Sequence, residues 1–162
     1  MTTNKKNATQ ERHHQQARDR LEPHVAAAIG QAREQCNPLS VIILDVDVFR
    51  QINETYGHNI GDKVLEELPV IAEQQAGLPV VRWGGEEFAV LCPDHNLEEA
   101  EALAERIRVA VANHSFSGAG AITVSLGVAT HQADKPAMDV IQRADAATYR
   151  AKTEGRNRVV VG

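Results

Sequence analysis

The sequence predicts an α/β (α+β) fold in which helices pack against one mixed central β-sheet. Apolar stretches with helical and strand periods alternate along the chain, and two predicted strands are joined by a tight hairpin turn. The chain has 162 residues, 43% of them hydrophobic, which is enough to bury one core. We expect a single domain over residues 20–162, preceded by a polar tail or helix end over residues 1–19.

The first predicted elements are a helix, a buried strand and a second helix. The first helix begins near Leu21, with Pro23 in its first turn. Residues 41–44 form an unbroken apolar run, which is typical of a central strand covered on both faces. A helical pattern follows over residues 64–72, and we expect a kink at Pro69 because proline lacks an amide hydrogen.

The second half of the chain predicts a hairpin followed by two further helices and two strands. Residues 79–91 indicate strand, turn and strand, because Gly84 and Gly85 separate two apolar runs. Asn96 is expected to cap the next helix in a capping box with Glu99. The remaining elements are a strand over residues 122–129, a helix over 138–153 ended by Gly155, and a last strand over 159–161.

Composition excludes several classes of protein. The formal net charge of −5 argues against a broad basic face for nucleic acid, and any anionic ligand would need metal and a few well-placed cations. The two cysteines form no CxxC pair, and no apolar run reaches the roughly 18 residues of a membrane span. The first residues lack the apolar segment of a signal peptide. We expect a cytoplasmic protein with no nucleic-acid and no membrane partner.

Two acidic clusters stand at the ends of predicted strands. Asp45 and Asp47 close the buried strand, and Glu86 and Glu87 lie at the hairpin turn. If the strand and the hairpin are neighbours, Asp45 and Glu86 converge into an oxygen cage for Mg²⁺. Two such ions would activate a hydroxyl and stabilise a pyrophosphate leaving group. Each acid alone is more typical of a loop cap or a surface charge, whereas for the two clusters together, with Gly84 and Gly85 beside one of them, both interpretations stay open.

Glycines and cations near these clusters also have two interpretations. Gly84 and Gly85 permit positive φ and a close approach of ligand to the main chain, although a tight hairpin needs glycine for its own geometry. Lys152 and Arg156 lie four residues apart at the end of the last predicted helix, where they complement the helix dipole or reach triphosphate oxygens. A Gly-x-x-x-x-Gly-Lys-Ser/Thr loop is absent, which excludes a P-loop nucleotide site.

Several segments together resemble the GGDEF family in its GGEEF form. They are Arg-Trp-Gly-Gly-Glu-Glu-Phe at residues 82–88 and the segments 45–62, 125–129, 143–145 and 149–157, in the family's order and spacing. The resemblance covers roughly residues 38–162. It implies a palm-like sheet similar to polymerase palm and adenylyl cyclase domains. It also implies a diguanylate cyclase, which condenses two GTP into cyclic di-GMP with loss of two pyrophosphates.

The resemblance implies roles for individual residues. Two Mg²⁺ (or Mn²⁺) ions per site would bind Asp45, the Val46 carbonyl and Glu86. Catalysis would fall to Glu86, to Glu87 as general base or metal helper, and to Arg50, which replaces the family's usual lysine. Residues that match base-reading, hairpin and phosphate positions would bind substrate: Phe49, Asn53, His58, Asp62, Gly84, Gly85, Lys152 and Arg156. The guanine-reading pair, Asn53 and Asp62, would stand with His58 in the loop after the first strand, and would reject adenine.

The resemblance also implies catalysis at the interface of a homodimer, because one domain of this family holds one GTP. The family's opening motif, Asp-x-Leu-Thr-Gly-Leu-x-Asn-Arg, is replaced by residues 10–18, where only Arg18 corresponds. The product-inhibition motif Arg-x-x-Asp is replaced by residues 75–78, so we expect no product feedback. A sensory domain does not precede the catalytic one, so we expect either a fragment or a short protein paired by an upstream sensor or partner protein.

Two alternative functions stay open. A catalytically idle GTP-binding or protein-binding module would have kept the pocket while losing the opening motif. The intact set of Asp45, Glu86, Glu87, Lys152 and Arg156 argues against it, because an idle site need not keep all five. A cyclase of mixed or adenine-containing dinucleotides is the second alternative, and Asp62 at the base-reading position disfavours it.

Overall fold

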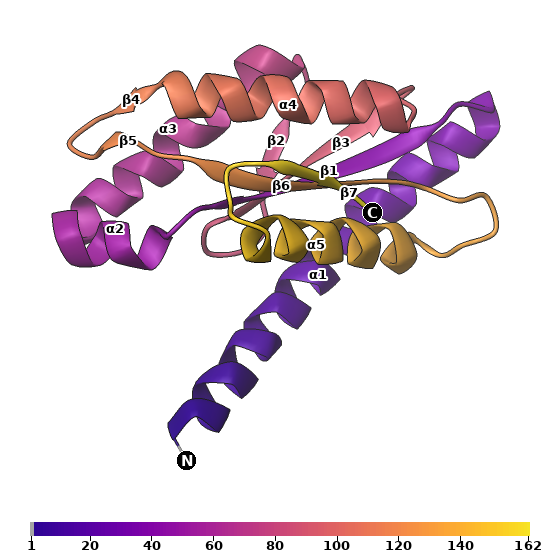
Figure 1. Ribbon diagram of the computed structural model, residues 1–162. Coiled ribbons are helices and arrows are strands. Elements are labelled where there is room, and N and C mark those ends of the chain that lie inside the picture. The colour runs from indigo at the N-terminus through magenta and orange to yellow at the C-terminus, as the bar shows by residue number, and fades with distance from the viewer. Residues whose placement is uncertain (1) are drawn as a thin grey trace.

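The computed structural model describes residues 2–162, apart from the side chains of residues 2–14 and 17. In chain order the elements are α1 (Thr2–Gln35), β1 (Leu39–Val46), α2 (Phe49–Tyr56), α3 (His58–Ala76), β2 (Val80–Arg82), β3 (Glu87–Pro93), α4 (Leu97–Asn113), β4 (Ser115–Phe116), β5 (Gly120–Ala121), β6 (Val124–Thr130), α5 (Ala137–Thr153) and β7 (Val159–Val161) (Figure 1). None of the described helices combines the length and the apolar character that crossing a membrane requires.

The sheet is mixed and has five strands in the order β2-β3-β1-β6-β7. β1 lies at its centre and runs antiparallel to both β3 and β6, while β6 and β7 are parallel. A two-stranded ribbon of β4 and β5 stands apart from this sheet. The predicted mixed sheet with flanking helices is confirmed.

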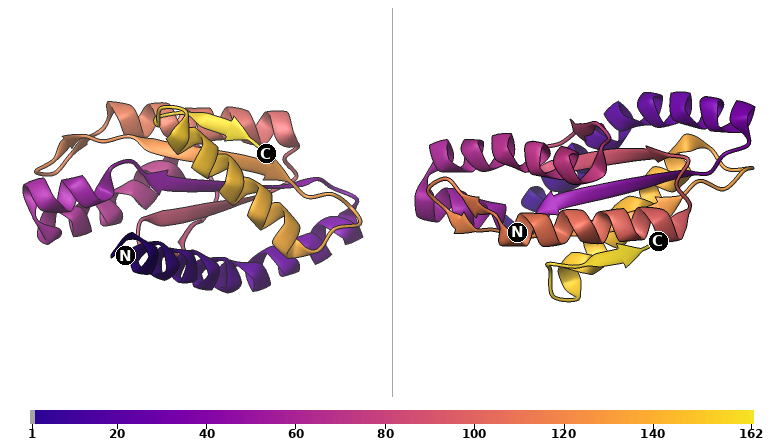
Figure 2. Two further views of the ribbon diagram at one scale, coloured as in Figure 1. Left: turned by 60° about the horizontal axis from the view of Figure 1, so that its bottom comes forward. Right: turned by 90° about the horizontal axis from the view of Figure 1, so that it is seen from above.

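Helices cover both faces of the sheet, α3 and α4 on one side and α1 and α5 on the other (Figures 1 and 2). Alternate residues of a strand point to opposite faces. Ile42 and Leu44 therefore join the core beneath α3 and α4, whereas Val41 and Ile43 join the core beneath α1 and α5. This double coverage is why the first predicted strand is an unbroken apolar run rather than an alternating one.

A glycine in β6 lets α5 lie unusually close to the sheet. A Cβ atom on Gly127 would overlap the carbonyl oxygen of Ala144 and the backbone nitrogen of Thr148. The buried Thr148 hydroxyl donates to the Ile43 carbonyl in β1 at 3.2 Å and to the Ala144 carbonyl at 2.9 Å. The C-terminal half of α5 is thereby held against β1.

The segment after β1 differs from the expected loop. Residues 49–56 and 58–76 form α2 and α3, so the candidate base-reading residues lie on helices. Val48 adopts a left-handed conformation with φ of 50° before α2, and Gly57 has φ of 89° between the two helices. These two positive-φ residues turn the chain sharply enough for two helices to fit where an irregular loop was expected.

The prediction for the first helix is wrong: α1 begins at Thr2 rather than near Leu21, so Pro23 lies inside the helix and not in its first turn. The remaining predicted elements are found close to their expected positions. The hairpin of β2 and β3 pairs Val81 with Ala89, and the capping box of Asn96 and Glu99 starts α4. Pro69 lies inside the uninterrupted α3. The sequence did not predict β4 and β5, because two-residue strands carry no periodic signal.

Candidate functional site

The acidic end of β1 lies directly beside the hairpin turn. Asp45 pairs with Glu87 across the β1–β3 ladder, and the Val46 amide donates to the Glu86 carbonyl at 3.3 Å. Asp45 and Glu87 are buried, with 8% and 6% of their surface exposed, and Glu86 is half-buried. The two acidic clusters of the sequence therefore meet at one end of two neighbouring strands.

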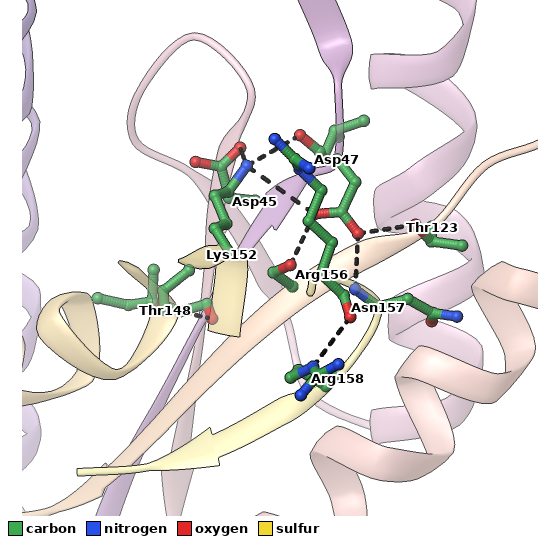
Figure 3. Close-up of polar contacts among 11 residues, drawn as sticks. Asp45, Asp47, Thr123, Thr148, Lys152, Arg156, Asn157 and Arg158 are labelled. Atoms are coloured by element: carbon green, nitrogen blue, oxygen red, sulfur yellow. Dashed lines mark hydrogen bonds and ion pairs between the residues drawn. The ribbon is translucent and has the colours of Figure 1, made fainter. Parts of the chain in front are cut away.

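An ammonium group lies among these acids. Lys152 Nζ is 3.1 Å from Asp45 Oδ1 and 4.0 Å from Asp47 Oδ1, and it donates to the Val46 carbonyl at 3.2 Å (Figure 3). Asp45 Oδ1 is buried, and the Lys152 ammonium is the cation beside it. The end of β1 thus presents oxygen atoms that converge on a cation.

Burial and neighbouring charges make the Asp45 carboxylate more basic than an ordinary aspartate. Desolvation raises its pKa from 3.8 to about 8; the Lys152 ammonium lowers the pKa, while the Glu86 and Glu87 carboxylates raise it. Like charges gathered in a poorly solvated place are costly unless a cation neutralises them. A pKa shifted by burial and by specific charged neighbours makes Asp45 a candidate functional residue.

The donors available for a metal are the Asp45 carboxylate, the Val46 carbonyl and the Glu86 carboxylate. All are hard oxygen ligands of the kind that Mg²⁺ and Mn²⁺ prefer. The ammonium held between the buried Asp45 oxygen and the Val46 carbonyl shows that the position suits a cation. Within the described part of the chain, three or more His, Cys, Asp or Glu side chains are nowhere arranged to enclose an ion without other ligands. The residues present fit a metal that also takes ligands from substrate and water.

Asp47 has a different role from Asp45. It is 2% exposed, and its carboxylate accepts hydrogen bonds from Thr123 Oγ1 at 2.7 Å, Ser125 Oγ at 2.6 Å and the Asn157 amide at 3.0 Å (Figure 3). Both of its oxygens are engaged, so it ties β1 to β6 and to the loop after α5. Asp47 stood in the acidic cluster of the sequence, yet nothing there distinguished an anchoring carboxylate from a metal ligand.

Arg156 lies beyond α5 rather than at its end, which corrects the sequence-based prediction. The helix stops at Thr153, and Gly155, Arg156 and Asn157 all have positive φ, at 130°, 63° and 47°. The Arg156 amide closes the turn by donating to the Ala151 carbonyl at 2.9 Å. The exposed side chain of Arg156 extends toward the same end of β1 as the Lys152 ammonium (Figure 3).

The candidate base-reading residues gather where α2 meets α3. A Cβ atom on Gly61 would overlap Asn53 Oδ1 and would lie 3.3 Å from the Phe49 ring, so the two helices touch at this glycine. Asn53 Oδ1 is buried without a hydrogen-bond partner. Asp62 follows Gly61 in the first turns of α3, and Asp62 and His58 are both exposed. An acceptor without a partner thus stands beside an accessible carboxylate.

Arg50 is not brought to the acids. Its guanidinium is exposed and pairs with Glu54, one turn later in α2, at 3.2 Å.

The hairpin glycines also differ from one expectation, because neither Gly84 nor Gly85 has a positive φ. A Cβ atom on Gly85 would meet no other atom within 4 Å, so the space beside this glycine is open. Both glycines border a cavity of about 500 Å³ whose other wall is α1.

Arg18, the single match to the family's opening motif, joins α1 to α5. Its Nη1 atom lies 3.1 Å from Asp145 Oδ2, and both side chains are largely buried. The partner of Arg18 lies 127 residues away along the chain, and the sequence offered no signal for this pairing.

The comparisons with known proteins identify the family of this chain. The family model "Diguanylate cyclase, GGDEF domain" matches residues 15–158. Diguanylate cyclase DgcM of Escherichia coli strain K12 is 48% identical over 123 residues, which is 75% of this chain and 30% of DgcM. The chain therefore spans about a third of the length of that relative.

Solved structures show the same fold at substantial identity. The active GGEEF domain of a diguanylate cyclase from Vibrio cholerae superposes with a TM-score of 0.81 at 35% identity, covering 88% of this chain and 94% of that one. The GGDEF domain of DgcB from Caulobacter crescentus, solved in complex with c-di-GMP, gives a TM-score of 0.81 at 33% identity and covers 89% of each chain. The sequence, the fold and the acidic strand end lead to one assignment: this chain belongs to the GGDEF family of diguanylate cyclase domains.

Proposed function

We propose that this chain is the catalytic domain of a diguanylate cyclase, which joins two GTP molecules into cyclic di-GMP and releases two pyrophosphates. One observation carries the proposal. The buried Asp45, whose carboxylate is more basic than an ordinary aspartate, and the Val46 carbonyl lie beside Glu86 and Glu87, with a cation already among them. Family relatives named as diguanylate cyclases support the same reaction.

The reaction is an in-line phosphoryl transfer. The 3′-hydroxyl oxygen of one GTP bonds to the α-phosphorus of the other, the bond from that phosphorus to pyrophosphate breaks, and the hydroxyl proton goes to a base. Repetition in the opposite direction closes the ring. Positioning and charge neutralisation supply most of the acceleration in such transfers.

The chain's own residues divide these tasks. Asp45, the Val46 carbonyl and Glu86 would hold two Mg²⁺ or Mn²⁺ ions, which supply activation of the hydroxyl and neutralisation of the phosphates when bound. Glu87, which is buried directly across from Asp45, would accept the hydroxyl proton.

Cations and backbone dipoles would bind the phosphates. Lys152 and Arg156 reach the end of β1 from α5 and the loop after it. α2 begins at the same end of β1. Its N-cap residue is Val48, whose side chain makes no capping hydrogen bond to the backbone amides of the first turn. Helix N-termini of this kind attract anions. Arg50 lies in the first turn of α2 and adds a positive charge. Its side chain would leave Glu54 and pair with a phosphate group or with the second domain.

Asn53 and Asp62 would select guanine. The unpartnered Asn53 oxygen would accept a hydrogen bond from guanine, and the Asp62 carboxylate would accept others. Adenine lacks these donors and would leave a buried acceptor unpaired, which costs binding energy. Phe49 and His58 would line the same position, and a competition assay with ATP tests the preference.

Catalysis would require two copies of the domain. One set of metal ligands and one base-reading pair serve one GTP, while the product contains two guanine nucleotides joined head to tail. We therefore propose a homodimer whose two sites face each other, with pairing aided by an upstream sensor or a partner protein.

Incubation with GTP and Mg²⁺, followed by chromatography of the products, tests the proposal. We expect cyclic di-GMP and pyrophosphate, with a specific rate that rises with protein concentration. The absence of any cyclic dinucleotide over a wide concentration range would reject it. GTP affinity measured by calorimetry without turnover would instead identify an idle binding module.

A further inference from the structure

The loop that carries Arg156 is fixed from two sides through its neighbour Asn157. The Asn157 amide donates to the buried Asp47 carboxylate at 3.0 Å. Its side-chain oxygen accepts a hydrogen bond from Arg108 Nη1 in α4 at 2.9 Å. Asn157 has φ of 47°, in the left-handed region that asparagine adopts more readily than most residues, and Arg156 before it has φ of 63°.

The Arg108 guanidinium is oriented by a second partner, Glu105, in its own helix. Its Nε atom donates to Glu105 Oε2 at 2.9 Å, and Nη2 donates to Glu105 Oε1 one turn earlier in the same helix. This two-pronged pairing fixes the plane of the guanidinium and leaves Nη1 for Asn157. The Arg108 side chain is 22% exposed, so it is also partly shielded from water.

The contact joins parts of the fold that are far apart in sequence. α4 covers the face of the sheet opposite α5, while the loop leaves the end of α5 (Figure 1). Arg108 lies 49 residues before Asn157. Together with Asp47, it gives the left-handed turn of Arg156 and Asn157 one support from the sheet and one from the opposite helix layer.

We infer that Arg108 and Asn157 are positioning residues of this enzyme: they hold Arg156 where it binds the nucleotide's phosphates. This inference rests on the proposed function, since it gives Arg156 its phosphate. Neither Arg108 nor Asn157 touches substrate in this assignment. Both act through the backbone that sets the direction of Arg156.

A double-mutant cycle on GTP affinity tests this coupling. Arg108→Ala removes one hydrogen bond from the loop, so GTP binding measured by calorimetry with Mg²⁺ should weaken by about threefold to tenfold. In an Arg156→Ala background the same substitution should change GTP affinity by less than about twofold, because the group it positions is already gone. Arg106→Ala is the matched control, since Arg106 is exposed on the same helix and should leave GTP affinity unchanged.

A second variant keeps the test decisive if Arg108→Ala does not fold. Asn157→Gly keeps the amide that Asp47 binds and tolerates the positive φ, but it removes the oxygen that Arg108 contacts. It should reproduce the loss of GTP affinity while guanosine, which lacks phosphates, binds as it does to the parent protein in saturation-transfer NMR.

Equal losses in both backgrounds, unchanged GTP affinity, or a parallel loss of guanosine binding would each overturn the positioning role. A parent protein that binds no GTP would instead refute the proposed function itself, and Arg156 would then have no phosphate to bind.

Discussion

The substitution Asp45→Asn should stabilise the metal-free protein while abolishing its activity. Asp45 is 8% exposed, and burial beside Glu86 and Glu87 raises its pKa from 3.8 to about 8. The folded state therefore binds a proton more tightly than the unfolded state does. Stability is highest below about pH 4 on this account of Asp45, and it falls as the pH rises from about 4 to about 8.

The size of this effect follows from the pKa. One pKa unit corresponds to about 1.4 kcal/mol, so a shift from 3.8 to about 8 lowers the free energy of unfolding by up to about 5 kcal/mol at pH 8. Asparagine removes the charge but is itself a buried polar group, and it deprives Lys152 of its ion pair at 3.1 Å. Asp47, 4.0 Å from the ammonium, still offsets part of that charge. We expect a net gain of about 1–2 kcal/mol at pH 8.

Urea denaturation in EDTA at pH 5, 6, 7 and 8 measures this gain. The difference between Asp45→Asn and the parent protein should grow with pH. Asp47→Asn is the matched control: its carboxylate accepts three hydrogen bonds, and an amide cannot accept all of them, so it should destabilise by about 1–3 kcal/mol at every pH. An Asp45→Asn protein that is less stable than the parent at pH 8 would show that the ionised Asp45 carboxylate does not lower the free energy of unfolding.

Four further outcomes are expected. Glu86→Gln should abolish cyclic di-GMP formation in the chromatographic assay while the urea midpoint stays within error, and retained turnover in both this variant and Asp45→Asn would mean that the metal ligands are misassigned. Gly127→Ala should destabilise by about 1–3 kcal/mol in urea, because its Cβ would overlap the α5 backbone; an unchanged midpoint would contradict that packing. Gly61→Ala should displace the Asn53 side chain and raise the KM for GTP more than it lowers kcat, and a normal KM would remove Asn53 from base recognition. Added cyclic di-GMP should leave the initial rate unchanged at concentrations comparable to GTP, because residues 75–78 lack the Arg-x-x-Asp motif; inhibition would reveal a product site elsewhere.

The order of elements was predictable because local patterns determine it. The apolar run at residues 41–44, the glycine pair at the hairpin and the capping box at Asn96 each carry a physical signal that needs no tertiary context. The sequence missed the two-residue strands β4 and β5, and it mistook the helical segment 49–62 for a loop. The second error has its cause in Val48, which adopts a left-handed conformation directly before α2. Valine rarely adopts this conformation, so the sequence did not predict a sharp turn there.

The candidate site was predictable in its residue types and less so in its contacts. The alternation of acids after a buried strand indicates a cation site from residue types alone. Which acid anchors and which stays available depended on long-range partners: Asp47 meets Thr123 and Ser125 of the adjoining segment, whereas Asp45 meets Lys152. Local sequence does not encode such pairings, because the sheet order sets them.

The position of bound metal tests the central claim most directly. A crystal structure with Mn²⁺ and a non-hydrolysable GTP analogue would locate the ions by their anomalous scattering. We predict manganese within coordination distance of the Asp45 carboxylate, the Val46 carbonyl and Glu86, with Lys152 moved from Asp45 to a phosphate oxygen. Manganese found away from the end of β1, or Glu86 directed away from it while nucleotide is bound, would contradict the proposed chemistry.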